Sequence, residues 1–445
     1  MILTVRVMLK FVFLRYETFK YSYYHSTNME IENEITILND WWKSGNISGE
    51  LAKGYKRKVF VEFKRLFKSH REVLVLSGLR RVGKTTIIYQ QIMDLLKEHK
   101  PRSIVYFTFD YVTINLVELL DTYSKLTGID WKHEKIFLFL DEIQKLKGWS
   151  SQVKVLFDAF PNLKIVVSGS ASLQLEKDAM DNLAGRHFML EIKPLSLVEF
   201  YELKYGKVID RPELYRSEFV AETGSYIKRP FPAAVKWRDG DVYAYIRESV
   251  LSKIIRGDLP DTFREVNVAL LERMIDVFYS NPGMIINVDE MAKNFSISKT
   301  TFEKHMFFLK FAKLIRTCAN FRGSAISMSR KNKKVYPYDI SLAFPFNPNV
   351  GIGTVTETKV ASVINAKMYW RDGKDEVDFV SNQKGKVEGI EVKAANILTK
   401  SDMTGLHKFA RKFGAKKFLI YNGKKGNLDR VTLLNFTDFL IAEKV

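Results

Sequence analysis

The sequence predicts an α/β protein of several domains, and three observations support this fold class. At 445 residues the chain is longer than one hydrophobic core usually spans. Short apolar runs alternate with helical stretches between residues 73 and 191, which is the pattern of a parallel sheet covered by helices. Helices and short strands alternate again from residue 266 to the C-terminus, which indicates further mixed domains.

The composition is that of a globular protein with a basic surface. Hydrophobic residues make up 46% of the chain and charged residues 27%. The excess of 70 Lys and Arg over 51 Asp and Glu gives a net charge of +19, which favours polyanionic partners such as nucleic acid, nucleotides or an acidic membrane face. The single cysteine, Cys318, excludes an internal disulfide and a cysteine-based zinc site, so we expect a cytoplasmic protein.

Residues 1–28 differ in composition from the rest of the chain. They hold one acidic residue and many aromatic residues, and Arg6 and Lys10 interrupt their only apolar run. That run is too short to cross a bilayer and lacks a small-residue cleavage site. We expect an N-terminal extension or a misassigned start before Met29, with a membrane-surface anchor as the alternative, and no membrane-spanning segment elsewhere.

A phosphate-binding loop is predicted after a short strand over 73–77, because the letters G-x-x-x-x-G-K-T follow it and a helix begins at about Lys84. The glycines let backbone N–H groups curl around a phosphate. Lys84 would reach the β- and γ-phosphates, and the Thr85 hydroxyl would ligate Mg²⁺. The candidate nucleotide-binding residues here are Gly78, Arg80, Gly83, Lys84, Thr85 and Thr86.

A second motif, "KIFLFLDEIQ", has the apolar run of a central parallel strand and ends in Asp141 and Glu142. Asp141 would hold Mg²⁺ through water, and Glu142 would polarise the attacking water as general base. An acid pair at this position favours ATP hydrolysis over small-molecule phosphorylation. The alternative is that two acids merely end a strand.

Three more apolar runs fit the same sheet and begin at residues 103, 163 and 187. The run from 163 ends in Ser168 and Ser170, whose hydroxyls would sense the γ-phosphate. Arg186 is a candidate charge-stabilising arginine that acts in cis or from a neighbouring subunit. It could equally be a surface salt-bridge residue.

The segment 266–345 predicts a winged helix-turn-helix, because helix, short strand, helix, tight turn, helix and strand succeed one another. Ser298 precedes the second helix of the motif, which would offer Lys299, Thr300, Thr301 and Lys304 to DNA. Ten Lys and Arg stand against two acids between residues 299 and 344. The alternative is a packing module whose charges face solvent.

The C-terminal segment carries a carboxylate pattern that a nuclease metal site also uses. Glu357 lies on a predicted helix, and Asp378 and Glu391 lie on two predicted strands. In sites of the PD-(D/E)xK type such carboxylates converge on Mg²⁺, and a lysine placed like Lys393 steadies the nucleophile or the phosphate. Because Glu391 and Lys393 are two residues apart on a strand, they share a face. The alternatives are a charged surface hairpin and a binding platform without cleavage.

Five segments together resemble one family: "SGLRRVGKTT", "FLDEIQ", "VSGSAS", "LAGR" and "KPLSLVEF". They are similar to an archaeal and bacterial family of P-loop ATPases, related to AAA+ and STAND ATPases, whose chains end in a restriction-endonuclease-like domain. The resemblance runs from about Met29 to the C-terminus. It implies a P-loop NTPase parallel sheet with a helical lid, followed by a winged helix-turn-helix and a restriction-endonuclease-like α/β domain.

The expected function is therefore that of a Mg²⁺-dependent ATPase that acts on or near DNA, with nuclease activity in the C-terminal domain left open. ATP and Mg²⁺ are the expected cofactors, and DNA and further copies of the chain are the expected partners. The alternative is a STAND-like switch or defence module whose C-terminal domain only binds a partner. The expected segments are 1–28 (extension), 29–200 (ATPase), 201–265 (lid), 266–345 (winged helix) and 346–445 (nuclease-like).

Overall fold

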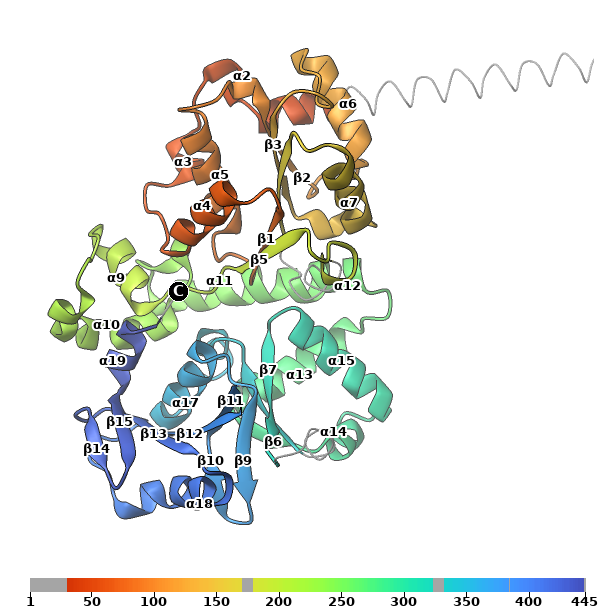
Figure 1. Ribbon diagram of the computed structural model, residues 1–445. Helices are drawn as coiled ribbons and strands as arrows, with labels where there is room; N and C mark the ends of the chain where they lie inside the picture. The colour runs from red at the N-terminus through yellow and green to blue at the C-terminus, as the bar shows by residue number, and fades with distance from the viewer. Residues whose placement is uncertain (1–29, 170–178, 323–331, 384, 444–445) are drawn as a thin grey trace, which may run out of the picture.

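The computed structural model describes residues 30–169, 179–322, 332–383 and 385–443 (Figure 1). The expected extension 1–28 and Ser170 lie outside the described residues. Three five-stranded sheets organise the chain, one in its first half and two in its second. Within these ranges, no helix is both long and apolar enough to cross a membrane.

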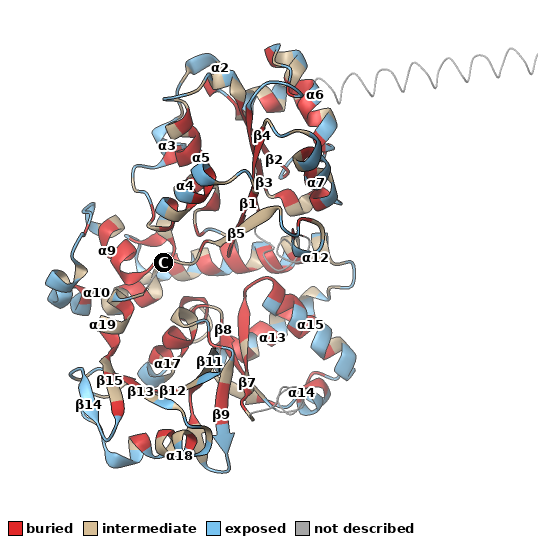
Figure 2. Ribbon diagram, in the orientation of Figure 1, coloured by how far each residue is buried: buried red, intermediate tan, exposed pale blue. Residues whose placement is uncertain are grey.

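The first sheet is parallel throughout, as predicted, with the strand order β2-β3-β4-β1-β5. The first four strands are fully buried because helices cover both faces, which suits their continuous apolar runs (Figure 2). The strands are β1 (Val73–Ser77), β2 (Ile104–Thr108), β3 (Ile136–Asp141), β4 (Leu163–Ser168) and β5 (His187–Glu191). The helices are α4 (Val59–Ser69), α5 (Lys84–Leu95), α6 (Leu116–Thr127) and α7 (Trp149–Ala159).

The N-terminal segment closes the open edge of the first sheet at β2. It consists of a helix over 30–38, α2 (Trp41–Ser44) and α3 (Gly49–Ala52). The Asn39 side chain accepts a hydrogen bond from the Tyr106 N–H at 2.7 Å and donates one to the Tyr106 carbonyl at 2.8 Å. One amide side chain thus takes the place of a neighbouring strand, which protects the edge from pairing with another chain.

Helices dominate the next segment, which contains α9 (Leu197–Tyr205), α10 (Arg216–Lys228) and a long helix over 239–262. The assignment of this segment to a lid stays a prediction. We call residues 239–262 the connecting helix. It starts as α11 (Asp239–Tyr245), contains two π-helical stretches (Ile246–Ser252 and Ile254–Asp258) and ends as α12 (Leu259–Thr262). Figure 1 shows it lying between the first sheet and the second half of the chain.

The elements predicted after the lid occur in the expected order. They are α13 (Val268–Ser280), β6 (Met284–Ile286), α14 (Val288–Asn294), α15 (Lys299–Phe311), β7 (Ile315–Asn320) and β8 (Lys333–Pro337). Ser298 caps α15, because its hydroxyl accepts a hydrogen bond from the Thr301 N–H at 3.1 Å. The assignment of these elements to a winged helix stays a prediction.

The second and third sheets are mixed. The second, β10-β9-β7-β8-β6, continues from β7 into β9 (Met368–Asp372) and β10 (Asp375–Val377). Because β7 pairs with β9 in parallel, strands on both sides of the expected boundary at 345/346 share one sheet. The third, β11-β12-β13-β15-β14, contains β11 (Phe379–Gln383), β12 (Lys386–Lys393), β13 (Lys416–Tyr421), β14 (Gly426–Leu428) and β15 (Val431–Asn435). The helices of this segment are α17 (Ile352–Val363), α18 (Thr404–Phe413) and α19 (Phe436–Ile441).

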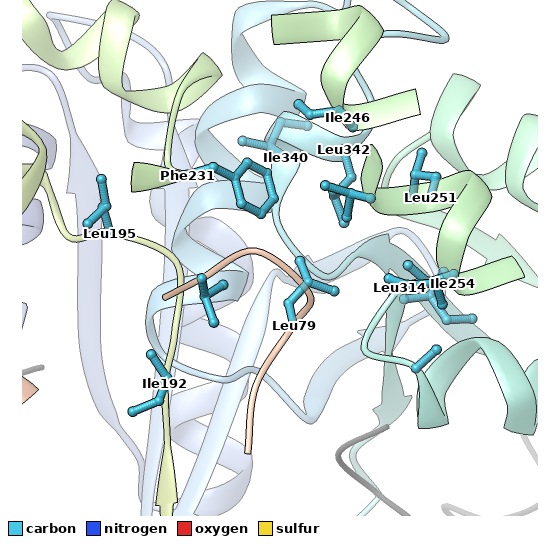
Figure 3. Close-up of a cluster of buried hydrophobic side chains, with 14 of the residues drawn as sticks. Leu79, Ile192, Leu195, Phe231, Ile246, Leu251, Ile254, Leu314, Ile340 and Leu342 are labelled. Atoms are coloured by element: carbon cyan, nitrogen blue, oxygen red, sulfur yellow. The ribbon is translucent and has the colours of Figure 1, made fainter. Parts of the chain in front are cut away.

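One apolar cluster joins the halves of the chain. Leu79 of the phosphate-binding loop packs with buried side chains of the connecting helix and of the second half (Figure 3). The labelled members are Leu79, Ile192, Leu195, Phe231, Ile246, Leu251, Ile254, Leu314, Ile340 and Leu342. The loop therefore packs against the connecting helix. Because interiors are close-packed, a displacement of one should displace the other.

Candidate functional site

Lys84 occupies the predicted place at the first turn of α5, and its side chain is buried. Its ammonium donates to two carbonyl oxygens of its own loop, Gly78 O at 3.0 Å and Leu79 O at 3.1 Å. Burial lowers the pKa of Lys84, although the nearby charges of Glu142 and Asp141 oppose this shift. A buried ammonium held by neutral carbonyls is chemically suited to an anionic ligand such as a phosphate.

Glycine is required at the start of this loop. Gly78 has φ +150°, and a Cβ there would lie 2.3 Å from the carbonyl oxygen of Ile192. Ile192 directly follows β5, and its N–H donates to the Ser77 carbonyl at 2.7 Å. The end of β5 thus lies against the loop and fixes its path.

Asp141 lies at the carboxyl end of β3 and gathers hydroxyl groups around a buried carboxylate. The Thr85 hydroxyl donates to Oδ2 at 2.6 Å, and the Ser168 hydroxyl donates to Oδ1. The Tyr106 hydroxyl, which sequence reasoning missed, donates to Oδ2 at 3.2 Å. Burial and the neighbouring charge of Glu142 raise the pKa of Asp141. These oxygens form a set that a hard cation such as Mg²⁺ prefers.

Glu142 comes directly after Asp141, in the left-handed backbone region with φ 50°. Its carboxylate accepts a hydrogen bond from the Gln144 side chain at 2.5 Å. The structure therefore brings Lys84, Thr85, Asp141, Glu142 and Ser168 to one edge of the first sheet. Parallel strands place their carboxyl ends at the same edge, which is where ligands bind in such sheets.

A cavity of about 820 Å³ opens beside these residues, a size that suits a nucleotide. Its walls include predicted residues of the loop and residues that the motifs did not reveal. The predicted lining residues are Arg80, Gly83, Lys84, Thr85, Thr86 and Glu142. The unpredicted ones include Tyr55 and Leu195, and from the helical segment Leu203, Pro232, Ala233 and Tyr245.

Arg57, which was not predicted, holds the predicted phosphate-binding loop through the Val82 carbonyl. Its side chain, 6% exposed, donates to Glu199 Oε2 at 2.6 Å and to the Val82 carbonyl at 3.1 Å. Burial alone would raise the pKa of Glu199, but the charge and hydrogen bonds of Arg57 outweigh burial and lower it. This pair ties the loop to α9.

The structure does not bring Arg186 to the phosphate-binding loop. Arg186 precedes β5, whose first residue, His187, pairs with Val73 at the amino end of β1, whereas the loop follows the carboxyl end of β1. Its guanidinium pairs with Asp158 at 2.7 Å. A role in cis is therefore wrong, because the side chain lies at the opposite edge of the sheet. A role from a neighbouring subunit stays a prediction.

The C-terminal carboxylates lie close together, as their spacing predicted. Asp378 is at a bend between β10 and β11 rather than inside a strand, and it accepts a hydrogen bond from the Val392 N–H at 2.9 Å. Burial and the charges of Glu391 and Glu357 raise the pKa of Asp378. Lys393 donates to Glu391 Oε1 at 2.9 Å, while Oε2 of Glu391 is buried and, within the described residues, accepts no hydrogen bond.

A buried lysine, Lys334, also contacts this cluster. The ammonium of Lys334, whose side chain is 6% exposed, lies 2.5 Å from Glu376 and 3.7 Å from Asp378, and it also contacts Glu357. Burial alone would lower the pKa of Lys334, but the charges of these three carboxylates outweigh burial and raise it. Within the described ranges, no three His, Cys, Asp or Glu side chains are arranged to hold a metal ion. The metal site expected at Glu357, Asp378 and Glu391 stays a prediction.

Three of the four α15 residues expected to contact DNA are exposed, and both lysines among them are ion-paired. Lys299 lies 3.0 Å from Asp289, and Lys304 pairs with Glu265. Thr300 is exposed and Thr301 is half-buried. These acids would compete with a nucleic acid for the two lysines.

Comparisons with known proteins divide the chain into three matched regions. Residues 70–201 match the family described as AAA domain, which supports ATP and Mg²⁺ as ligands in general. Residues 230–346 and 355–438 match two domains of unknown function, DUF8612 and DUF4143.

Three similar proteins are distant relatives that are described as uncharacterized. One from Methanocaldococcus jannaschii is 26% identical over 290 residues, which is 60% of this chain and 60% of the relative. A second from that organism is 27% identical over 333 residues, which is 69% of this chain and 72% of the relative. A protein of Haemophilus influenzae is 25% identical over 243 residues, 54% of this chain and 59% of the relative. The matched region thus spans about three fifths of the length of the first and the last of these relatives.

Proposed function

We propose that the protein is a Mg²⁺-dependent ATPase whose nucleotide state controls the position of its C-terminal half. The observation that carries the proposal is the convergence of Lys84, Thr85 and Asp141 beside a cavity of about 820 Å³. The AAA-domain match over residues 70–201 supports it.

The residues of this edge fit a magnesium–nucleotide complex. Thr85 and, through water, Asp141 would hold Mg²⁺, which would neutralise charge on the phosphates. Lys84 would exchange the loop carbonyls for phosphate oxygens. Glu142 would accept a proton from the attacking water, and Ser168 would contact the γ-phosphate.

Two substitutions test these roles. Lys84→Ala should lose nucleotide affinity because a phosphate-binding charge disappears, whereas Glu142→Gln should keep ATP bound and stop turnover. Binding of a fluorescent nucleotide and release of phosphate are the two measurements. Glu98→Gln is the control, because Glu98 is exposed three residues beyond the end of α5, remote from the loop. Normal hydrolysis by Glu142→Gln would remove Glu142 from its role.

A second candidate concerns the C-terminal domain: under nucleotide control it would bind a partner without cleaving it, in contrast to a nuclease. Lys334 favours this candidate over a nuclease, because its ammonium contacts two of the three carboxylates that a metal would need, Glu357 and Asp378. DNA is the proposed partner, on the basis of the net charge of +19 and the basic α15 segment. Plasmid incubated with Mn²⁺ and ATP should stay intact under the switch hypothesis and become nicked or cut under the nuclease hypothesis.

A further inference from the structure

Arg80 is the residue of the phosphate-binding loop that contacts a distant element. Its Nη1 lies 3.0 Å from Oδ1 and 3.1 Å from Oδ2 of Asp258, and the two side chains are 22% and 12% exposed. Its Nε is buried and, within the described residues, has no hydrogen-bond partner. Arg80 also lines the nucleotide cavity, so one guanidinium faces both Asp258 and the space for a ligand.

Asp258 lies on the connecting helix beside the hydrolytic residues. The end of this helix, α12, contacts the short turn Ile143–Lys145 that comes after Glu142. Burial alone would lower the pKa of Arg80, but the negative charges of Asp258 and Glu142 outweigh burial and raise it. The loop, the hydrolytic acid and the connecting helix thus meet at one point.

The connecting helix leads directly into contact with α15. Phe263, the residue after α12, lies within the aromatic side chains of α15, with ring centroids 4.6 Å from Phe308 and 4.7 Å from Phe311. Phe263 is only about one and a half helical turns beyond Asp258. A shift of the connecting helix at Asp258 would therefore move α15, because packed side chains move together.

We infer that Arg80 distinguishes ATP from ADP by leaving Asp258 for the γ-phosphate, and that this exchange moves the connecting helix and α15. The inference rests on the proposed ATPase function. A guanidinium forms strong paired hydrogen bonds with phosphate as well as with carboxylate, and the unpaired Nε supplies a further donor. Asp258 and the γ-phosphate then compete for one cation, so binding and helix position are linked.

Neither Arg81 nor Arg186 offers this link. Arg81 is exposed in the left-handed region with φ 70°, and Arg186 lies at the opposite edge of the sheet. A purely structural role for the Arg80–Asp258 pair makes a different prediction, since it would affect stability and treat both nucleotides alike.

Calorimetric titration of the full chain with a non-hydrolysable ATP analogue and with ADP separates these roles. Asp258→Asn should bind the ATP analogue about tenfold more tightly while ADP affinity stays constant, because the competing carboxylate is gone. Arg80→Met should weaken the analogue by about tenfold or more and leave ADP nearly unchanged. Arg80→Lys keeps the charge, and it should fall between the wild type and Arg80→Met.

Hydrogen exchange tests whether the nucleotide moves the connecting helix and α15. In the wild type, amides of residues 259–265 and of α15 should exchange at different rates with the ATP analogue and with ADP, and Arg80→Met should abolish this difference. Glu272→Gln is the matched control, because it breaks an exposed pair at 2.7 Å with Arg256 of the same helix as Asp258. It should change neither the ratio of the two affinities nor the exchange pattern.

The outcomes distinguish the inference from the function on which it rests. If the wild type hydrolyses ATP but the Arg80 and Asp258 variants change the affinities for the ATP analogue and for ADP equally, the inference alone is overturned. A wild type that binds neither nucleotide would overturn both. Thermal unfolding of each variant shows whether it is folded. If Arg80→Met does not fold, Asp258→Asn, which removes only a charge, still tests the inference.

Discussion

The ammonium of Lys334 lies 3.0 Å from Oε1 of Glu357, and the two side chains come from a strand and a helix on opposite sides of the expected 345/346 boundary. Tyr336 donates to the same carboxylate oxygen at 2.6 Å. Two side chains of β8 thus hold the carboxylate of Glu357. The carboxylate cluster thus joins the second sheet to the C-terminal segment.

Lys334→Met should destabilise the protein by about 3–5 kcal/mol, because it leaves buried carboxylates facing one another without a cation. Urea unfolding measures this change, with Lys333→Met on the same strand as the control. Mn²⁺ should stabilise the variant more than the wild type, since the carboxylates then lack their cation. Equal stability of the variant and the wild type would contradict this role of Lys334.

Arg57→Met should cost about 3–5 kcal/mol near neutral pH, because Glu199 is left buried and unpaired. The pKa of Glu199 is lowered in the folded wild type, so the pair stabilises fully above the unfolded-chain value of about 4.3 and loses this contribution as pH falls through the folded value. Without Arg57, burial would raise that pKa. The difference in free energy of unfolding between the two proteins should therefore shrink in acid.

A control for this prediction is Arg65→Met on α4. Arg65 pairs with Glu62 at 2.6 Å, and both side chains are largely exposed. Its unfolding should resemble that of the wild type at every pH, because exposed pairs contribute little. A pH-independent loss in Arg57→Met would show that packing rather than charge is responsible.

Gly78→Ala should abolish nucleotide binding. The added Cβ would collide with the Ile192 carbonyl oxygen at 2.3 Å, and backbone atoms cannot move aside without shifting the loop or β5. Gly128→Ala is the control, because Gly128 also has positive φ but has open space around its Cβ position. Unaltered affinity in Gly78→Ala would show that the loop tolerates a different path.

Lys299→Ala combined with Lys304→Ala should weaken binding to duplex DNA and reduce the slope of log affinity against log salt by up to about two units, if both lysines touch phosphate. Fluorescence anisotropy at several salt concentrations measures both quantities. Lys207→Ala with Lys236→Ala, two exposed lysines of the helical segment, is the control. An unchanged slope would leave α15 as a packing element.

The local parts of this architecture could be predicted from the sequence. The run from Val73 to Leu95 specifies strand, loop and helix through neighbouring residues alone, since glycine spacing and apolar periodicity act within one or two turns. Asp141 and Ser168 could be placed by the same rule, because both end buried parallel strands.

The long-range pairs could not be predicted in this way. Arg57 and Glu199 are 142 positions apart, and Arg80 and Asp258 are 178 apart, so no local pattern connects them. Lys334 lies in a basic stretch that composition assigns to a solvated face, yet its side chain is buried. Such partners are set by how sheets pack, which periodicity does not specify.

The parallel pairing of β7 with β9 has a consequence for how the chain can be divided. Ala319 and Asn320 lie opposite Met368 and Tyr369 in the intact protein. A recombinant fragment ending at residue 345 would present that side of β7 as an unsatisfied edge, which invites aggregation. A junction placed after Val377, the last residue of β10, would instead keep all five strands of the second sheet on one side of it.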